Sequence, residues 1–544
     1  MPPPDLLILL LFVSVTVLSL LSGFPVAFGL GGAGLLVIGM LVVLSMLGFA
    51  PLNAEGWTII DISVWRDLSP LSNDVFGFMV PSGRVLLAIP LFILMGYLLQ
   101  HAGVAQALLR GLSAAFRGVP GGLGVAVVLV GGVMAASTGI VGASVATLTV
   151  FALPTLLKAG YGSARASGIV AASGTLGQII PPSIILLLLA DQVGRQFAVA
   201  RLSAGDFAPM AITSGDLFRG ALLPGGMTLI GFMGVALWLG RTAGPVGGTV
   251  EGSPPIPGSV SETLHGMIAD VIAPVGLIVI VLGAILAGMA DTTSAASFGV
   301  VGALVLAARQ LWITWLTTVL AILLVGWNLL PDGSMRSGLS PPAVGLFIAF
   351  LLLCALSLLR TLRCGILQAA VSDSLRLTAM IFAILIGAAL FSLCFRTLEG
   401  DLWLTALLSD WMDGAPSILT LVGGVDEASA RARLALLALL VLIFLLGFVL
   451  EFIEIIVIVL PLALPLVFAV PPEHLDPVWA AVLIALALQT SFLTPPFGFA
   501  LFYFKGAAGD RVQSSALYKG AAPFVGLQLV VLALVWTFPV LVLS

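Results

Sequence analysis

Long uncharged apolar runs recur along this sequence, and they limit the folds that are open to it. The first run covers residues 6–21, and similar runs continue to the C-terminus. A helix needs about 20 mainly apolar residues to cross the hydrocarbon core of a bilayer. Only 8% of the residues are charged, against about 25% in a soluble domain. The sequence therefore predicts an all-α polytopic membrane protein embedded in a lipid bilayer.

Charge and residue content exclude several classes of function. The formal net charge is −4, so we expect no basic surface for nucleic acid. None of the three lysines, Lys158, Lys505 and Lys519, stands in a phosphate-binding loop, so the chain cannot use ATP by that route. The three cysteines and three histidines are scattered and indicate neither a disulfide framework nor a metal cluster. We expect no organic cofactor.

Short motifs that occur twice in the same order indicate an internal repeat. Two of the matches are SGTLGQIIPPS (173–183) with LQTSFLTPPFG (488–498), and DLFRGALLP (216–224) with ALYKGAAP (516–523). We interpret residues 5–240 and 268–544 as two repeats. The polar, Pro/Gly-rich residues 241–267 would form the linker between them.

The two copies are expected to be inverted relative to each other. The turn before the proline pair carries Lys158 and Arg165 in the first copy, but Glu473 and Asp476 in the second. Basic residues favour the cytoplasmic side, which puts the two turns on opposite faces. One set of arginines would then lie on the outer side, balanced by nearby carboxylates: Arg195, Arg201 and Arg219, with Asp191, Asp206 and Asp216.

Each copy contains a paired proline that should break a helix, within residues 166–192 and 478–503. Proline lacks an N–H and clashes with the carbonyl one turn earlier. In hydrocarbon the freed carbonyls must find partners, and a cation is one such partner. The N-terminus of each half-helix can attract an anion. Polar residues surround both breaks: Ser173, Thr175, Gln178, Ser183, Gln489, Thr490, Ser491 and Thr494. The alternative is a packing kink satisfied by neighbouring helices.

An interrupted apolar segment precedes each break, near residues 130–158 and 433–470. The first has Ser137, Thr138, Ser144 and Thr147 in mid-run, which predicts a re-entrant hairpin with its tip near residues 138–144. Close packing of small residues between helices is the alternative. The second segment contains Glu451 and Glu454. Intramembrane carboxylates mark an ion path or a buried pair, and we expect the larger role for Glu451.

Four of these segments together resemble the large membrane subunit of tripartite ATP-independent periplasmic (TRAP) transporters, nearest the mannitol/chloroaromatic-type set. They are residues 136–147 (ASTGIVGASVAT), 173–183, 445–461 (LLGFVLEFIEIIVIVLP) and 488–506 (LQTSFLTPPFGFALFYFKG). The resemblance implies an elevator-type, sodium-driven secondary transporter of the bacterial inner membrane, with two inverted repeats. It also implies three partners: a small four-span membrane subunit, a periplasmic substrate-binding protein, and a small organic acid as substrate.

The resemblance further implies that the hairpin tips and helix breaks form the sites. For the substrate it points to Ser137, Thr138, Ser144, Ser173, Gly174, Thr175, Gln489, Thr490 and Ser491. For sodium, the coupling ion, it points to Gly142, Thr147, Gly177, Pro181, Glu451, Thr494 and Pro495.

The sequence departs from the family pattern in three places. Glu451 stands where the family usually has aspartate, and DTTS at residues 291–294 replaces a T-P-T-E element at the start of an arm helix. Two apolar runs within residues 311–360 have no counterpart in the family pattern. An even number of added spans keeps the topology of all that follows.

Three other functions remain open at this level. An uncoupled channel or facilitator would need a continuous polar pore, whereas the polar atoms here cluster at two matched breaks. A non-transporting membrane scaffold subunit would leave those breaks without a role. An intramembrane protease has little support, because no histidine accompanies a G-x-S-x-G motif and no pair of intramembrane aspartates occurs.

Overall fold

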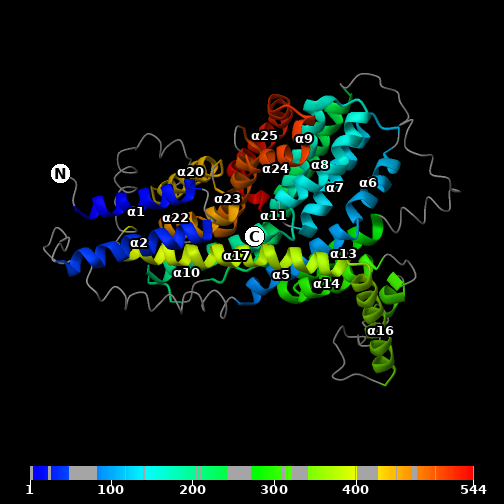
Figure 1. The fold of residues 1–544 in the computed structure, drawn as a ribbon, viewed down its shortest axis with the longest axis horizontal. Coiled ribbons are helices and arrows are strands. Elements are labelled where there is room, and N and C mark those ends of the chain that lie inside the picture. Colours follow the sequence, from blue (N-terminus) through cyan, green and yellow to red (C-terminus); the bar gives the residue numbers. More distant parts are fainter. Residues whose placement is uncertain are drawn as a thin grey trace.

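Helices make up the fold throughout the part of the chain that the computed structural model describes, and this part contains no strand (Figure 1). The described residues are 4–22, 26–47, 83–116, 118–138, 141–203, 205–207, 210–241, 271–308, 313–314, 316–321, 341–398, 400, 427–448, 450–468, 475–495 and 498–542. The expected all-α fold is confirmed. The predicted linker, apart from Arg241, and much of the first added run lie outside these residues.

Seven helices among the described residues are long and apolar enough to cross a membrane, or eight with the pair α5–α6. They are α2 (Val26–Met46), α8 (Val141–Lys158), α11 (Ser214–Arg241), α16 (Pro341–Arg363), α17 (Ile366–Thr397), α20 (Glu427–Leu446) and α25 (Ser514–Thr537). Helices α5 (Gly83–His101) and α6 (Val104–Ala115) meet at a 62° bend. The protein is therefore a multi-pass membrane protein.

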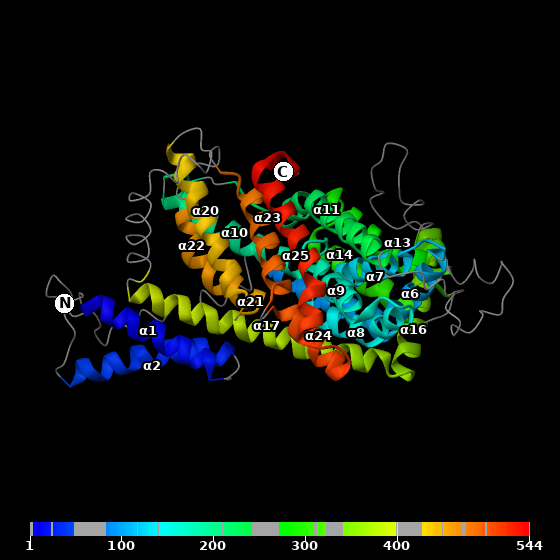
Figure 2. The ribbon, with the colours of Figure 1, turned by 90° about the horizontal axis from the view of Figure 1, so that it is seen from above.

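Helix α1 (Pro4–Leu21), α2 and α17 pack together at one end of the molecule (Figure 2). The ring of Phe12 on α1 stacks on Phe391 of α17, with 5.0 Å between ring centroids. Gly387 of α17 lies so close to the carbonyl of Ala27 that a side chain would not fit there. In lipid, no hydrophobic effect drives helices together, so their association depends on close packing. Small residues allow that close approach.

Both halves of the chain contain the same order of elements. In the first half, α7 (Gly122–Thr138) pairs with α8, and a helix broken between α9 (Gly162–Thr175) and α10 (Ile184–Ser203) follows. In the second half, α20 pairs with a chain of three short elements: α21 (Phe452–Glu454), a π-helical segment (Ile455–Val459) and α22 (Leu460–Val467). A helix broken between α23 (Pro477–Leu493) and α24 (Phe499–Ala508) comes next.

The two halves are interlocked by a reciprocal exchange of contacts. Helix α9 of the first half packs against α25 of the second, and α23 of the second packs against α11 of the first. Helix α8 contacts α24, and α22 contacts α10. Aromatic pairs occur at these contacts, including an edge-to-face pair between Phe197 and Phe468 with centroids 5.4 Å apart. Each broken helix is thus held by the other half; the orientation of the halves in the bilayer stays a prediction.

Helices α13 (Ala273–Leu286) and α14 (Thr292–Ala307) cover the α5 side of this core. The carboxylate of Asp291 accepts a hydrogen bond from the backbone N–H of Ser294 at 3.1 Å. The DTTS element therefore begins α14 with an aspartate cap, which supplies the acceptor that a helix N-terminus needs.

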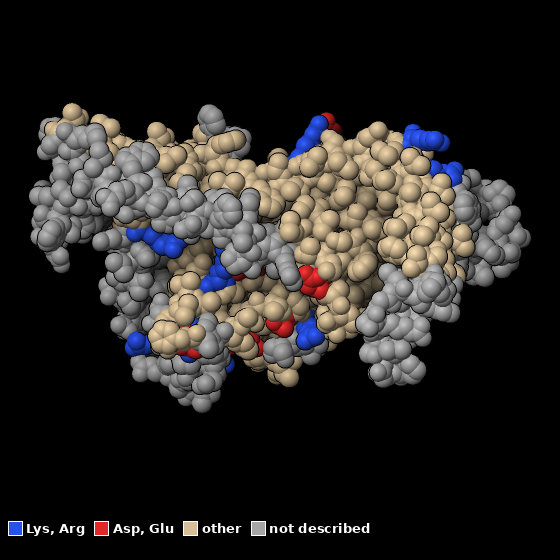
Figure 3. Space-filling model, turned by 90° about the horizontal axis from the view of Figure 1, so that it is seen from below, with Lys and Arg blue, Asp and Glu red and all other residues tan. Residues whose placement is uncertain are grey.

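The arginines predicted on the outer side have local partners of two different kinds. Arg195 pairs with Asp191 at 3.0 Å and Arg201 pairs with Asp206 at 3.3 Å, as expected from the sequence. Arg219 instead donates to the carbonyl oxygen of Leu286 at 2.7 Å. Figure 3 shows how few charged side chains the described part of one face carries, as the low charge content requires.

Candidate functional site

The first helix break is closed by hydrogen bonds of Ser183. After α9, a 3₁₀ turn covers Leu176–Gln178, and α10 begins at Ile184. The Ser183 hydroxyl donates to the carbonyl oxygen of Gln178 at 3.0 Å and accepts from the N–H of Ile185 at 3.2 Å. It therefore caps the N-terminus of α10 while satisfying a carbonyl freed by the break. The predicted residues Gly177 and Pro181 both lie in this buried segment.

The second break is held by Thr494. Its hydroxyl donates to the carbonyl oxygen of Thr490 at 2.7 Å, and its own carbonyl accepts from the N–H of Gly498 at 3.2 Å. Pro495 follows Thr494 in a turn, and α24 starts at Phe499. Pro496 lies outside the described residues. The predicted break is thus present at the residues expected from the proline pair.

The hydroxyl groups beside both breaks use their protons on backbone carbonyls one turn earlier. Ser173 donates to Ile169 at 2.6 Å and Thr490 to Leu486 at 2.7 Å. Two further hydroxyls do the same: Thr175 to Ala172 at 2.8 Å and Ser491 to Leu488 at 2.8 Å. All four side chains are buried. Because these hydroxyl groups already donate their protons, their oxygen lone pairs can only accept. They can therefore coordinate a cation or accept a hydrogen bond from a ligand.

Gln489 joins the two broken helices. Its side-chain N–H donates to the carbonyl oxygen of Thr175 at 3.4 Å, and both residues are fully buried. Its Oε1 has no hydrogen-bond partner among the described residues. Neither side-chain atom of Gln178 has one there either, although Gln178 is also fully buried. Unpaired buried polar groups cost about 1–3 kcal/mol each, which makes these two amides beside the breaks candidates for contact with a ligand.

Gln178 was expected beside the first break but was not among the predicted ligand-binding residues. Its place within SGTLGQIIPPS was a usable signal, since an uncharged amide inside an apolar segment needs a partner. Whether neighbouring helices supply a hydrogen-bond partner for this amide can be seen only in the structure.

Helices α7 and α8 form a hairpin that sits on α9 through two glycine contacts. A side chain at Gly131 of α7 would collide with Ser173, and one at Gly174 of α9 would collide with Val145 of α8. Three predicted substrate residues on the two elements are thereby brought together: Ser173, Gly174 and the buried Ser144. Thr138 ends α7; the side chains of Ser137 and Thr138, and residues 139–140 between the helices, lie outside the described residues.

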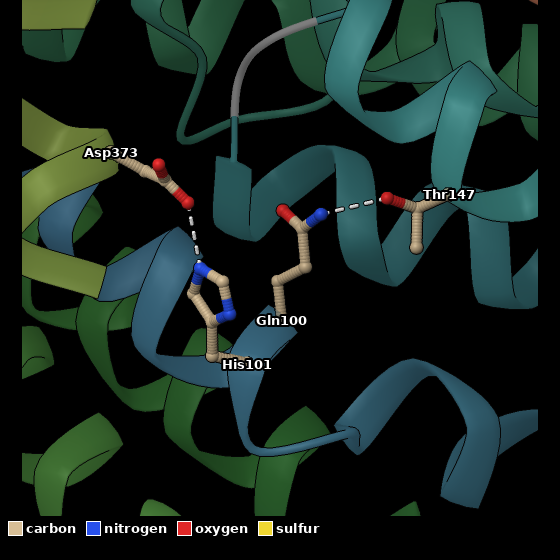
Figure 4. Close-up of polar contacts among 4 residues, drawn as sticks. All are labelled: Gln100, His101, Thr147 and Asp373. Atoms are coloured by element: carbon tan, nitrogen blue, oxygen red, sulfur yellow. Dashed lines mark hydrogen bonds and ion pairs between the residues drawn. The ribbon is translucent and has the colours of Figure 1, made fainter. Parts of the chain in front are cut away.

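Thr147 makes its side-chain hydrogen bond with α5. Its hydroxyl accepts a hydrogen bond from Nε2 of Gln100 on α5 at 2.7 Å (Figure 4). The adjacent His101 pairs with Asp373 of α17 at 2.8 Å. The C-terminal end of α5 is therefore joined to the first hairpin on one side and to α17 on the other. A sodium-ligand role for Thr147 stays a prediction, and this contact gives its hydroxyl another partner.

The tip of the second hairpin lies against the last turn of α23. A side chain at Gly447 would collide with the Ser491 side chain, so the Gly447 backbone lies directly against that side chain. Glu451 is the N-cap residue of α21, and its N–H donates to the carboxylate of Glu454 at 3.1 Å. Glu454 is buried and Glu451 partly so. Among the described residues, no lysine or arginine forms an ion pair with either carboxylate.

The other predicted residue of the first hairpin, Gly142, packs on α24. It lies directly under the ring of Tyr503. Both hairpins and both breaks thus converge, through the contacts of α9, α23 and α24. Among the described residues, no three His, Cys, Asp or Glu side chains are grouped closely enough to bind a metal ion. A cation bound here would be coordinated mainly by hydroxyl, carbonyl and single carboxylate oxygens, the ligands of hard cations.

The family model of the tripartite ATP-independent periplasmic transporter, DctM component, matches residues 12–327 and 308–541. The chain belongs to this family. The DctM protein of a C4-dicarboxylate TRAP transporter from Rhodobacter capsulatus is 28% identical over 208 residues, which cover 38% of this chain and 46% of that protein. The Pseudomonas aeruginosa DctM protein is 25% identical over 474 residues, 84% of this chain and 85% of the relative.

A solved structure shares the fold. The YdaH transporter of Alcanivorax borkumensis superposes with a TM-score of 0.55 over 98% of both chains, at 16% sequence identity. The resemblance read from the sequence motifs is confirmed by the DctM match. Members of this family are transporters and not enzymes, which removes the intramembrane protease from the alternatives.

Proposed function

We propose that this chain is the large membrane subunit of a sodium-coupled, elevator-type secondary transporter of the bacterial inner membrane, which imports a small organic acid. The observation that carries the proposal is the contact between Gln489 and Thr175 at 3.4 Å. It places two broken helices, each flanked by hydroxyl oxygens, side by side in the core. Helices interrupted in this way are the usual binding site of secondary transporters.

Sodium is supported by the kind of atoms that meet there. Around the second break, Thr490 and Thr494 offer hydroxyl oxygens whose protons are already committed. Glu451 adds a carboxylate from the hairpin tip that contacts this turn. A buried carboxylate without a counter-charge is expensive, and a monovalent cation neutralises it without a cluster of acidic ligands.

An organic anion is supported by the half-helices. Helices α10 and α24 both begin at a break, and the N-terminus of each carries partial positive charge from the helix dipole. The unpaired Nε2 of Gln178 provides a further donor. A carboxylate substrate would accept hydrogen bonds from these donors. An uncoupled polar pore would have no reason to concentrate such donors at two matched positions.

Partners follow from the family. We propose that a small four-span membrane subunit completes the transporter and that a periplasmic binding protein delivers the substrate. The relatives named above are described as C4-dicarboxylate transporters. C4-dicarboxylates are therefore the first compounds to test, followed by other small carboxylates and sulfonates.

The test is uptake in proteoliposomes that contain this chain with its small subunit. The panel of acids is first screened for binding to the binding protein, and the acid that binds is then supplied in radiolabelled form. We expect uptake only with an inward sodium gradient and added binding protein. Full uptake in sodium-free buffer under a proton gradient would contradict sodium coupling, and uptake that never exceeds equilibration would favour an uncoupled facilitator.

A further inference from the structure

The ion pair between His101 of α5 and Asp373 of α17 marks a level inside the membrane. The residue before His101, Gln100, binds Thr147 of α8 (Figure 4). At 1.5 Å per residue, Thr147 lies about 9 Å from the first residue of α8 and about 16 Å from its last. Because α8 is long and apolar enough to cross a membrane, this level falls within the hydrocarbon core, which is about 30 Å thick.

A polar face of α17 lies at the same level. Gln368, Ser372 and Arg376 follow one another at intervals of four residues, so they share one side of the helix, and all three are exposed. Arg376 is about 4.5 Å from Asp373 along the helix axis. Asp373 is already paired with His101, and their side chains are 37% and 31% exposed. Among the described residues, Arg376 has no ion-pair partner.

The other half of α17 packs against the chain itself. Helices α1 and α2 lie along the C-terminal half (Figure 2), where the ring of Phe391 stacks on Phe12. In the N-terminal half, Leu375 stands within the polar face and is 64% exposed. The described part of the chain therefore leaves this face uncovered.

The neighbouring helix α16 shows how a lipid-facing surface differs. Every exposed residue of α16 from Val344 to Leu359 is apolar, and the hydroxyl-bearing Ser357 is fully buried. Lipid chains offer no hydrogen bonds, so charged and amide side chains that face them are costly. The face of α17 around Arg376 has the opposite composition, which indicates that a protein partner covers it.

We propose that a membrane-spanning helix of the small subunit covers the polar face of α17, and that a carboxylate on that helix pairs with Arg376. Charge complementarity specifies the partner group, since arginine binds carboxylates well. Polar contacts of this kind hold membrane helices together. Gln368 and Ser372 extend the contact along α17. The proposal rests on the proposed function in taking the small subunit as a partner; a second copy of this chain is the rival occupant.

The first experiment identifies what lies against the polar face. The photoreactive residue benzoylphenylalanine replaces Leu375 in the chain, which is co-expressed with its small subunit and irradiated in membranes. The control carries benzoylphenylalanine in place of Phe502 of α24, which is 71% exposed. We expect a crosslink to the small subunit from residue 375 and none from residue 502. A crosslink from residue 375 only to lipid, to a second copy or within the same chain overturns the proposal.

The second experiment tests the charge of Arg376. Arg376→Glu should lower the amount of small subunit that co-purifies with this chain by about fivefold, and Arg376→Gln by a smaller factor, as for other polar contacts between membrane helices. Arg376→Lys should retain most of it. The matched control is Arg363→Glu, at an exposed arginine that ends α16. All four variants should reach the membrane in equal amounts. Equal retention with Arg376→Glu and Arg363→Glu overturns the proposal.

An exchange of charges completes the test. The crosslinked peptide identifies the partner helix, and each of its acidic residues is replaced in turn by arginine. One replacement should weaken assembly with the parent chain and restore at least half of the small subunit bound to Arg376→Glu. Absence of such a rescue overturns the carboxylate pair. These measurements use neither sodium nor substrate. A small subunit that never co-purifies would overturn the proposed partnership as well, whereas assembly that ignores this face overturns the present inference alone.

Discussion

The side-chain amide of Gln489 donates to the backbone carbonyl oxygen of Thr175, with 3.4 Å between the two atoms, and so joins the last turns of α23 and α9. Each residue lies six positions before the first proline of its pair, Pro495 and Pro181. In the predicted repeat these are equivalent positions of the two halves. Their contact brings the ends of α9 and α23 together in the buried core.

The unpaired amide of Gln178 gives a prediction about stability and function together. Gln178→Leu keeps a similar volume and removes two buried polar atoms that lack partners among the described residues. We expect the melting temperature of the purified complex to be unchanged or higher, while uptake falls about tenfold through loss of a ligand contact. Both are measured on the same preparation.

Gln528 provides the matched control for Gln178. It lies in α25, is fully buried, and also has no side-chain partner among the described residues, but it is not at a break. Gln528→Leu should leave uptake within about twofold of the parent while sharing the effect on melting temperature. Equal losses of uptake in the two variants would show that Gln178 has no special role at the site.

At Glu451, substitutions can separate the effect of the side-chain charge from the effect of its shape. Glu451→Gln removes the charge and should raise the sodium concentration for half-maximal uptake by about tenfold, because a charged ligand is lost. Glu451→Asp keeps the charge and restores the residue usual in the family, so uptake should be retained. Expression and melting temperature serve as controls. Unchanged sodium dependence in Glu451→Gln would assign this residue to structure.

Glu454 is expected to act on the hairpin and less on the ion. Its carboxylate accepts the hydrogen bond of the Glu451 N–H at 3.1 Å. Glu454→Gln keeps an acceptor oxygen and should change the sodium dependence by no more than about threefold, whereas Glu454→Ala should lower the melting temperature because the N–H is left unpaired. A larger sodium shift for Glu454→Gln than for Glu451→Gln would reverse the two roles.

The inverted orientation of the repeats predicts the labelling side of two turns. Cysteines are placed at Ser163, which is exposed in the first turn of α9, and at His474, which lies outside the described residues. In a background without the native cysteines, only His474→Cys should react with an impermeant reagent in intact spheroplasts. Reaction of both from the same face would contradict inversion.

The sequence predicted features that local chemistry decides. A proline pair within an apolar run disfavours a continuous helix, and the structure ends α9 and α23 shortly before the two pairs. The acidic tip of the second hairpin was also predictable, because two carboxylates within a long apolar run need a special environment.

Features that depend on how a helix is rotated were not predictable. Helix α8 is apolar along most of its length, so no amphipathic pattern indicated that Thr147 faces α5 while Val145 faces α9. Unpaired atoms, as in Gln178, are a property of the packed structure.

The contact between Gln100 and Thr147 predicts where movement of the first hairpin can be arrested. Their hydrogen bond, 2.7 Å long, joins α8 to α5, which belongs to neither hairpin nor either broken helix. In an elevator the hairpins move past such a helix, so this bond must break in each cycle. Cysteines at both positions, linked by a short bifunctional reagent in the background without native cysteines, should abolish uptake, and a reducible linker should restore it on cleavage.

The matched control links residues 101 and 373, which pair at 2.8 Å between α5 and α17. Both helices lie outside the hairpins and broken helices, so this second link should be tolerated. Full uptake with the first link intact would mean that the hairpin does not move relative to α5, and the elevator proposal would have to be abandoned.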